Sequence, residues 1–168
     1  MDYIWAPWRL GYVAADKPDK CVLCAKRDAA DDQANHVLCR GRDVFVLLNT
    51  FPYNSGHVMV VPYRHVGNLT DLSCGEVTEL MAMAQACIRA LGEALRAEGI
   101  NLGMNIGRPA GAGICDHIHL HVVPRWAGDT NYMTAIAETR VVPQSLADSA
   151  CQLRPLIQQA VASVLQHS

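Results

Sequence analysis

The chain has 168 residues, 51% of them hydrophobic, with a formal net charge of −2 and a pI near 6.4. This size and composition are typical of one globular domain with a sizeable core, so we expect a single domain over residues 1–168. The small net charge and scattered basic residues argue against a nucleic-acid-binding surface. Because the sequence holds neither a long apolar run nor a basic segment followed by one, we expect no membrane span and no signal peptide.

The seven cysteines form no regular framework, which indicates a reducing, cytoplasmic setting with most thiols acting as small core side chains. Cys21 and Cys24 are the exception, because the spacing Cys-x-x-Cys supplies half of a typical zinc site. Taken alone, the motif is also compatible with a redox-active pair or with no function. Two further ligands are needed before it indicates a metal.

The first half of the chain predicts short strands joined by tight turns. Residues 25–35 are polar and are expected to form a loop or a short helix. The segments VLCR and DVFVLLN lie on either side of Gly41 and predict a β-hairpin. After the turn FPYNSG, the segment HVMVVP predicts a third strand that ends at Pro62.

A long helix follows. Ser73 and Glu76 have capping-box spacing, and the apolar residues after them recur at helical intervals. We therefore expect a helix over residues 73–97 that stops near Gly99.

The last third of the chain predicts two more strands and a second helix. Residues 100–107 alternate as a strand, and the flexible turn 108–113 leads to HIHLHVVP, a strand closed by Pro124. A helix is expected from about Ser145, with a kink or break at Pro155. Strands gathered around one long helix indicate an α+β domain with an antiparallel sheet.

Three histidines recur at every second position in HIHLHVV. In a strand, His117, His119 and His121 share one face, and the apolar residues between them share the other. A solvent-exposed face is the simplest interpretation, but three neighbouring histidines would repel one another if all were protonated. A catalytic metal site is a second interpretation, although a Cα spacing of roughly 6–7 Å makes it awkward for all three to reach one ion.

Phosphate chemistry is the third interpretation of the histidines. One imidazole attacks phosphorus, while its neighbours bind phosphate oxygens and orient the ring. Asn105 on the preceding strand, together with backbone N–H groups of the turn, would then contact the phosphates. The turn residues concerned are Gly111, Ala112 and Gly113.

These segments together resemble a known family. HIHLHVV fits the histidine-triad pattern of the HIT superfamily of nucleotidyl hydrolases and transferases. Two longer segments resemble those that accompany the triad in this superfamily: LLNTFPYNSGHVMVVPYRH and NIGRPAGAGICDHIHLHVVPRWAGDTNYM. The resemblance runs through most of residues 36–135, and residues 1–35 would form an N-terminal zinc-knuckle segment. WAPWR, PYRH and VVPRW are most similar to the bacterial branch that contains diadenosine-tetraphosphate phosphorylases. The implied fold is α+β and HIT-like, with a five-stranded antiparallel sheet, one long helix and a C-terminal helix.

The resemblance also implies a role for each histidine. His119 matches the nucleophile that forms a covalent nucleotidyl-histidine intermediate, which water or phosphate then cleaves. His121 matches a residue that contacts the phosphate or the ribose side, and His57 matches a histidine that lines the site from a neighbouring strand. The implied substrate contacts are Asn49 at the ribose hydroxyls, Leu47 and Met59 beside the base, and Asn105 at the phosphates or leaving group.

Zinc-bearing branches of the superfamily imply the missing metal ligands. They pair Cys-x-x-Cys with a histidine after the third strand and with the first histidine of the triad, which here are His65 and His117. His36 is a competing candidate, because it lies between the cysteines and the first strand. The implied zinc is structural, with four protein ligands and no open position.

The sequence departs from the family pattern just before the triad. Many diadenosine hydrolases carry glutamine there and the phosphorylases carry Gly-Ser, whereas this chain has Ala-Gly-Ala-Gly at 110–113. Hydrolysis and phosphorolysis of a dinucleoside polyphosphate therefore both stay open, as does a nucleoside phosphoramidate or another adenylate as substrate. A nucleotide-binding regulatory module without turnover and a metalloenzyme are the remaining alternatives.

Two further expectations concern the surroundings of the site. Trp126 is either a partly buried structural indole or a ring that stacks on the substrate base. The family resemblance implies a homodimer, to which the apolar strand INLGMNIG would contribute.

Overall fold

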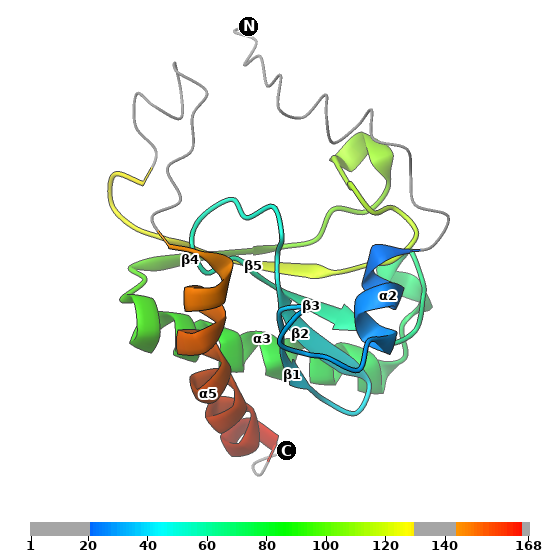
Figure 1. Cartoon of the computed structure of the whole chain (residues 1–168). Coiled ribbons are helices and arrows are strands. Elements are labelled where there is room, and N and C mark those ends of the chain that lie inside the picture. Colours follow the sequence, from blue (N-terminus) through cyan, green and yellow to red (C-terminus); the bar gives the residue numbers. More distant parts are fainter. Residues whose placement is uncertain (1–20, 130–143, 166–168) are drawn as a thin grey trace, which may run out of the picture.

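The fold is built on a five-stranded antiparallel sheet in a computed structural model that describes residues 21–129 and 144–165 (Figure 1). The strands lie in the order β1-β2-β3-β5-β4, so that β5 is inserted between β3 and β4. This confirms the α+β prediction with its antiparallel sheet. The strand bounds are β1 Val37–Arg40, β2 Val44–Leu48, β3 Val58–Pro62, β4 Gly99–Gly103 and β5 Leu120–Arg125.

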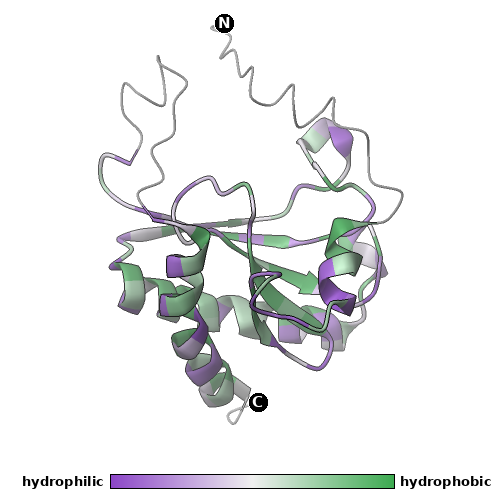
Figure 2. Cartoon of the chain, viewed as in Figure 1, coloured by the Kyte–Doolittle hydropathy of each residue, from purple (hydrophilic) through white to green (hydrophobic). Residues whose placement is uncertain are grey.

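Helices cover both faces of the sheet. Even-numbered strand residues such as Val46 and Val60 pack with the long helix α3 and the C-terminal helix α5 in one core, while α2 covers Phe45 and Val61 on the other face. In Figure 2 the central strands are green, whereas α2 and α5 show both colours, as expected for helices with one buried side. The helix bounds are α2 Val22–Asp28, α3 Cys74–Leu95 and α5 Leu146–Leu165, with short 3₁₀ turns at η1 Leu69–Asp71 and η2 Arg108–Ala110.

Helix α3 begins as predicted. The Ser73 side chain accepts from the Glu76 N–H, and the Glu76 carboxylate accepts from the Ser73 N–H. The helix ends earlier than predicted, at Leu95, because Arg96 takes up a left-handed conformation with φ of 52°. Helix α5 continues through Pro155, so the expected break is not observed.

The strands that carry the site are shorter than their sequence patterns predicted. Strand β5 begins at Leu120, because the Ile118 N–H donates to the Val66 carbonyl at 2.7 Å rather than to the sheet. Pro124 lies inside β5 and pairs with β4. The pairing of β5 with β3 has already ended at Val122, so the N–H that proline lacks costs no hydrogen bond to β3. Strand β4 ends at Gly103, which leaves Asn105 in the following loop.

Candidate nucleotidyl-transfer site and metal centre

The side chain of His119 is held with one ring nitrogen engaged and the other available. Its Nδ1 lies 2.9 Å from the His117 carbonyl oxygen, so Nδ1–H must donate and Nε2 carries the lone pair. The side chain is only 6% exposed, and this burial lowers the pKa of His119 although the His117 carbonyl opposes the shift. His119 is therefore a neutral imidazole at neutral pH, with the nitrogen that a nucleophile requires.

His57 and His121 form a hydrogen-bonded pair beside it. The His57 Nδ1 accepts from the Tyr53 N–H at 3.1 Å, so His57 carries its proton on Nε2 and donates it to His121 Nδ1 at 2.9 Å. His121 then carries its own proton on Nε2, where it can donate to a phosphate oxygen. Burial, followed by the charge of His119, lowers the pKa of His121 to about 4, so the ring is neutral at physiological pH.

Residues assigned to the base and ribose lie next to this pair. Leu47 and Met59 are cross-strand partners between β2 and β3, and His121 pairs with Met59 from the other side. Both apolar side chains are buried on the face away from α3. The Asn49 Oδ1 accepts from the Phe51 N–H at 2.9 Å, and its Nδ2 lies 3.4 Å from His57 Nδ1. The ribose contact of Asn49 stays a prediction.

The loop before the triad uses part of the predicted phosphate-binding backbone for its own turn. The Gly111 N–H donates to Arg108 at 2.9 Å, and the Ala112 N–H lies 3.4 Å from the Gly107 carbonyl oxygen. Both N–H groups therefore have partners within the turn, and their contacts with phosphate stay predictions. Asn105 and Gly113 both lie in this half-buried or exposed loop region, and their substrate contacts stay predictions.

Trp126 lies directly after β5 and is bonded to the end of α3. Its Nε1–H lies 3.2 Å from the Leu95 carbonyl oxygen and 3.1 Å from that of Arg96. The indole therefore caps carbonyl groups where α3 ends, in agreement with the structural interpretation of this residue. Stacking of the Trp126 ring on a substrate base stays a prediction.

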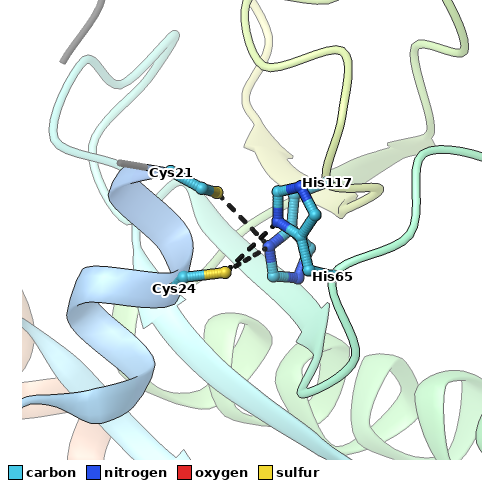
Figure 3. A group of neighbouring side chains, drawn as sticks. All are labelled: Cys21, Cys24, His65 and His117. Atoms are coloured by element: carbon cyan, nitrogen blue, oxygen red, sulfur yellow. Dashed lines mark hydrogen bonds between the residues drawn. The ribbon is translucent and has the colours of Figure 1, made fainter. Parts of the chain in front are cut away.

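Four side chains from three distant segments meet at a second centre (Figure 3). The ligand atoms of Cys21, Cys24, His65 and His117 all lie within 4.8 Å of one another. The Cys24 Sγ lies 3.2 Å from His65 Nδ1 and 3.5 Å from His117 Nδ1, and the Cys21 Sγ lies 3.4 Å from His117 Nδ1. His36 is not part of this group.

The donor set fits zinc. Two thiolates and two imidazole nitrogens around a tetrahedral Zn²⁺ would lie roughly 3.3–3.8 Å apart, given the usual bond lengths, and the observed separations are close to that. The His117 Nε2–H donates to the Pro62 carbonyl at 2.9 Å, which leaves Nδ1 free for a metal. Burial, and then Cys21, raise the pKa of Cys24, so a cation between the sulfur atoms is what would stabilise thiolates here.

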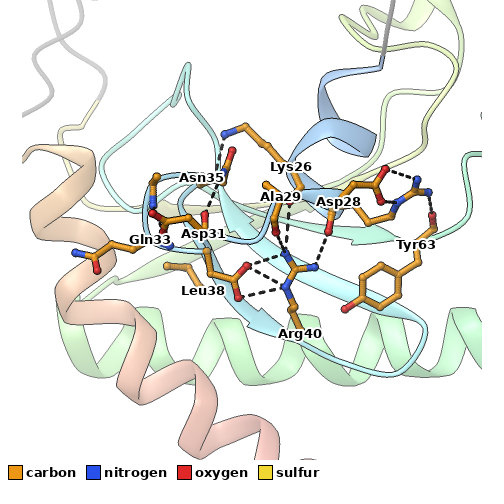
Figure 4. Close-up of polar contacts among 12 residues, drawn as sticks. Lys26, Asp28, Ala29, Asp31, Gln33, Asn35, Leu38, Arg40 and Tyr63 are labelled. Atoms are coloured by element: carbon orange, nitrogen blue, oxygen red, sulfur yellow. Dashed lines mark hydrogen bonds and ion pairs between the residues drawn. The ribbon is translucent and has the colours of Figure 1, made fainter.

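Polar contacts hold α2 in the position that this centre requires (Figure 4). Arg27 donates to the Tyr63 carbonyl at 2.6 Å, two residues before His65. Arg40 donates to the Arg27 carbonyl at 2.9 Å and forms an ion pair with Asp32 at 2.7 Å. These bonds fasten the helix that carries Cys24 to β1 and to the segment after β3 that carries His65.

Comparison with known proteins agrees with this geometry. The family model of the HIT domain matches residues 31–128. The chain belongs to the HIT family. A protein named AP-4-A phosphorylase from Mycobacterium tuberculosis is 41% identical over 158 residues, covering 89% of this chain and 80% of the relative. This confirms the family and the fold that the motifs predicted, and makes the chain a homologue of a HIT-type enzyme.

Other HIT proteins add to the comparison. A bis(5'-adenosyl)-triphosphatase from Dictyostelium discoideum is 36% identical over 81 residues, covering 48% of this chain and 54% of the relative. The crystal structure of a zinc-bound histidine triad family protein from Mycobacterium smegmatis superposes with a TM-score of 0.67 at 30% identity, covering 85% of this chain and 96% of that one. In residues 21–129 and 144–165, no helix is long and apolar enough to cross a membrane.

Several contacts at the site were not predicted from the sequence. Tyr53 touches His57 through both its backbone and its ring, and Pro62 orients His117 through its carbonyl. The position of Tyr53, four residues before His57 in a turn, is the one sequence signal that could have drawn attention to it. The carbonyl contact of Pro62 has no sequence signal, because any residue carries that group.

Proposed function

We propose that this protein cleaves dinucleoside polyphosphates such as diadenosine tetraphosphate through a covalent nucleotidyl-His119 intermediate. The observation that carries the proposal is the set of hydrogen bonds that orients the rings of His57, His121 and His119. It leaves a lone pair on Nε2 of His119 and a donor on Nε2 of His121. A nucleophile beside a phosphate-binding donor is what phosphorus transfer requires.

The first step forms one bond and breaks one. The Nε2 lone pair of His119 attacks the α-phosphorus, and the bond from this phosphorus to the bridging oxygen breaks with its electron pair leaving on ATP. Because ATP is stable as an anion, no proton has to be transferred to it. His121 stabilises the developing charge by donating its hydrogen bond. The Nδ1–H of His119 stays on the His117 carbonyl throughout and stabilises the cationic ring.

The second step releases the nucleotide. An oxygen of the second nucleophile attacks the same phosphorus, the N–P bond breaks, and its electron pair returns to Nε2 of His119. Hydrogen phosphate gives ADP by this route, and water gives AMP with release of one proton to the solvent. The 41% identity to an AP-4-A phosphorylase over 89% of the chain favours phosphate, and we propose phosphorolysis as the main reaction.

Product analysis tests the second nucleophile. The protein is incubated with diadenosine tetraphosphate in the presence and absence of inorganic phosphate, and the nucleotides are separated by chromatography. We expect ADP and ATP, with ADP formed only when phosphate is present. AMP and ATP in both reactions would instead identify an asymmetric hydrolase. Cleavage of an adenosine phosphoramidate but not of diadenosine tetraphosphate would show that the substrates are nucleoside phosphoramidates.

A trapping experiment tests the intermediate. Brief exposure to labelled diadenosine tetraphosphate without phosphate should add one nucleotidyl group to His119, detected by mass spectrometry, and His119→Ala should not be labelled. A metalloenzyme would show no adduct and would lose activity reversibly on chelation. A binding module would bind the nucleotide equally well with and without His119 and would release no product.

We propose that the cluster of two cysteines and two histidines binds a structural zinc ion. The cluster is present in the structure, and a zinc-bound HIT protein has the same fold. Four protein ligands leave no open position, so the metal would fasten α2 to the sheet rather than take part in the reaction. His117 would then hold the metal with its side chain and His119 with its carbonyl.

We also propose that the protein is a cytoplasmic homodimer. None of the seven cysteines forms a disulfide, which suits a reducing compartment. Strand β4 lies at one edge of the sheet and is mostly exposed, which suits pairing with a second copy.

A further inference from the structure

The ring of Tyr53 lies against both members of the His57–His121 pair. Its centroid is 4.8 Å from that of His57 at an interplanar angle of 32°, and 5.9 Å from that of His121 at 34°. The two imidazoles are 5.1 Å apart. All three separations fall in the range of attractive ring contacts, so the three rings form one packed group.

The position of this ring is fixed by the turn that carries it. The Tyr53 N–H donates to His57 Nδ1 at 3.1 Å. The next residue, Asn54, donates to the Pro124 carbonyl at 3.0 Å and to Asp129 at 2.9 Å. Gly56, with φ of +78°, lets the turn approach Leu91 and Leu95 of α3 so closely that a Cβ there would clash. The turn that carries the aromatic ring is thus hydrogen-bonded to β5 and packed against α3.

We propose that Tyr53 is a positioning residue, whose ring covers the His57–His121 hydrogen bond and keeps His121 oriented with its Nε2–H toward the substrate phosphate. The inference rests on the proposed function and adds a residue that acts through the pair and does not itself react. A flat ring over a hydrogen bond excludes water from it, which strengthens the bond and favours neutral imidazoles.

The remaining surroundings of His121 carry little charge. Among the described residues that pack against it, His57 and His119 are the groups that titrate besides the Tyr53 phenol. Its cross-strand partners are Met59 on β3 and Gly103 on β4, and neither carries a charge. Burial is the main cause that lowers the pKa of His121 to about 4, and the Tyr53 ring supplies part of that burial.

The test compares variants that keep or remove the ring. Tyr53→Phe keeps the ring and removes the hydroxyl, whereas Tyr53→Ala removes the cover. The His121 imidazole is titrated by NMR in each full-length protein, and its 15N shifts report which nitrogen is protonated. In Tyr53→Ala we expect the titration midpoint to rise by at least about one pH unit toward the ordinary value of about 6.5, with Tyr53→Phe close to wild type.

Steady-state kinetics supply a second readout. In Tyr53→Ala, kcat should fall about tenfold at pH 7 while KM changes less than about threefold, and the acidic limb of the pH profile should move to higher pH. An unchanged His121 midpoint and tautomer in Tyr53→Ala would overturn the proposal, as would an equal shift in Tyr53→Phe. If Tyr53→Ala does not fold, Tyr53→Leu removes the flat ring with apolar volume retained, and a shift in the same direction is expected.

The two proposals fail separately in this design, because the NMR titration needs no turnover. A wild-type protein that cleaves no dinucleotide, with a His121 midpoint that still depends on the Tyr53 ring, would reject the substrate proposal alone. If the wild-type protein phosphorolyses diadenosine tetraphosphate but the His121 titration midpoint is the same in wild type and Tyr53→Ala, only the role of Tyr53 is rejected.

Discussion

At the scale of single residues, four histidines take different roles because their ring nitrogens face different partners. His117 turns Nδ1 toward the sulfur atoms, and His119 donates from Nδ1 to a carbonyl. His57 and His121 both accept at Nδ1, which places the protons of both rings on Nε2. Strand alternation explains why the three triad histidines share a face. Their different roles depend on contacts with backbone carbonyl and N–H groups, which nearly every residue has and which the sequence therefore does not reveal.

A matched pair of substitutions tests whether His57 acts through the proton on its Nε2. In His57→Gln the side-chain amide can place a donor near the position of Nε2, whereas His57→Ala leaves His121 Nδ1 without its partner. We expect kcat/KM to fall about 100-fold in His57→Ala and by less than about tenfold in His57→Gln. Steady-state assays with diadenosine tetraphosphate measure both. Equal losses in the two variants would show that the donor at Nε2 is not what His57 contributes.

At the scale of elements, the N-terminus of α3 is joined to the segment that follows β3. Glu76 accepts two bonds from Arg64 at 2.7 Å and one from the Ser73 N–H. These bonds lower the pKa of Glu76 to about 2, Arg64 being the largest cause, and the carboxylate is only 8% exposed. Because Arg64 directly precedes His65, one carboxylate caps the helix and also positions a neighbour of the proposed metal ligand.

This contact makes the stability pH-dependent in a defined direction. The folded pKa of Glu76 is below its ordinary value of 4.5, so its contribution is complete above that pH and is lost as the pH falls toward about 2. We expect Glu76→Gln to lower the free energy of unfolding by about 2 kcal/mol at pH 7, and the difference from wild type to shrink below pH 4. Urea unfolding at several pH values measures this. Glu93→Gln, at an exposed position of the same helix, should change little at any pH.

Local signals predicted the elements well and their ends less well. The capping box at Ser73 and the short apolar runs of β2 and β3 act within a few residues, so the sequence shows them directly. The end of α3 was wrong by a few residues because Arg96, not a glycine, adopts the left-handed conformation. The start of β5 was wrong because the Val66 carbonyl, far away in the sequence, takes the Ile118 N–H. Such long-range backbone contacts have no local sequence pattern.

At the scale of the whole molecule, the proposed metal centre joins three segments that are distant in the sequence. Helix α2 supplies Cys24, the segment after β3 supplies His65, and the segment before β5 supplies His117. Since the His117 carbonyl also holds Nδ1 of His119, the metal centre and the nucleophile share a residue. Family resemblance supplied the identity of these ligands, whereas residue spacing alone could not have distinguished His65 from His36.

Loss of the metal should therefore weaken both the fold and the site. We expect about one zinc per chain in the purified protein, and we expect Cys24→Ser to lose it with a fall of about 10 °C in the thermal midpoint. Elemental analysis and calorimetry measure the two effects. Cys151→Ser, at an exposed position on α5, is the matched control and should keep both zinc and stability. Wild-type protein purified without chelators that is metal-free yet equally stable would contradict the zinc proposal.

The proposed dimer interface at strand β4 can be tested by substitution. Strand β4 pairs only with β5 in the described sheet, and Leu102 on it is 42% exposed although it is a large apolar side chain. A lysine at this edge would place a charge inside the pairing surface of a second copy and would disfavour association. We expect wild-type protein to have the mass of a dimer by light scattering, and Leu102→Lys to shift toward the monomer at micromolar concentration. Leu69→Lys, on η1 at a similar exposure of 39%, should remain dimeric. A wild-type monomer, or a dimer that tolerates Leu102→Lys as well as Leu69→Lys, would place any interface elsewhere.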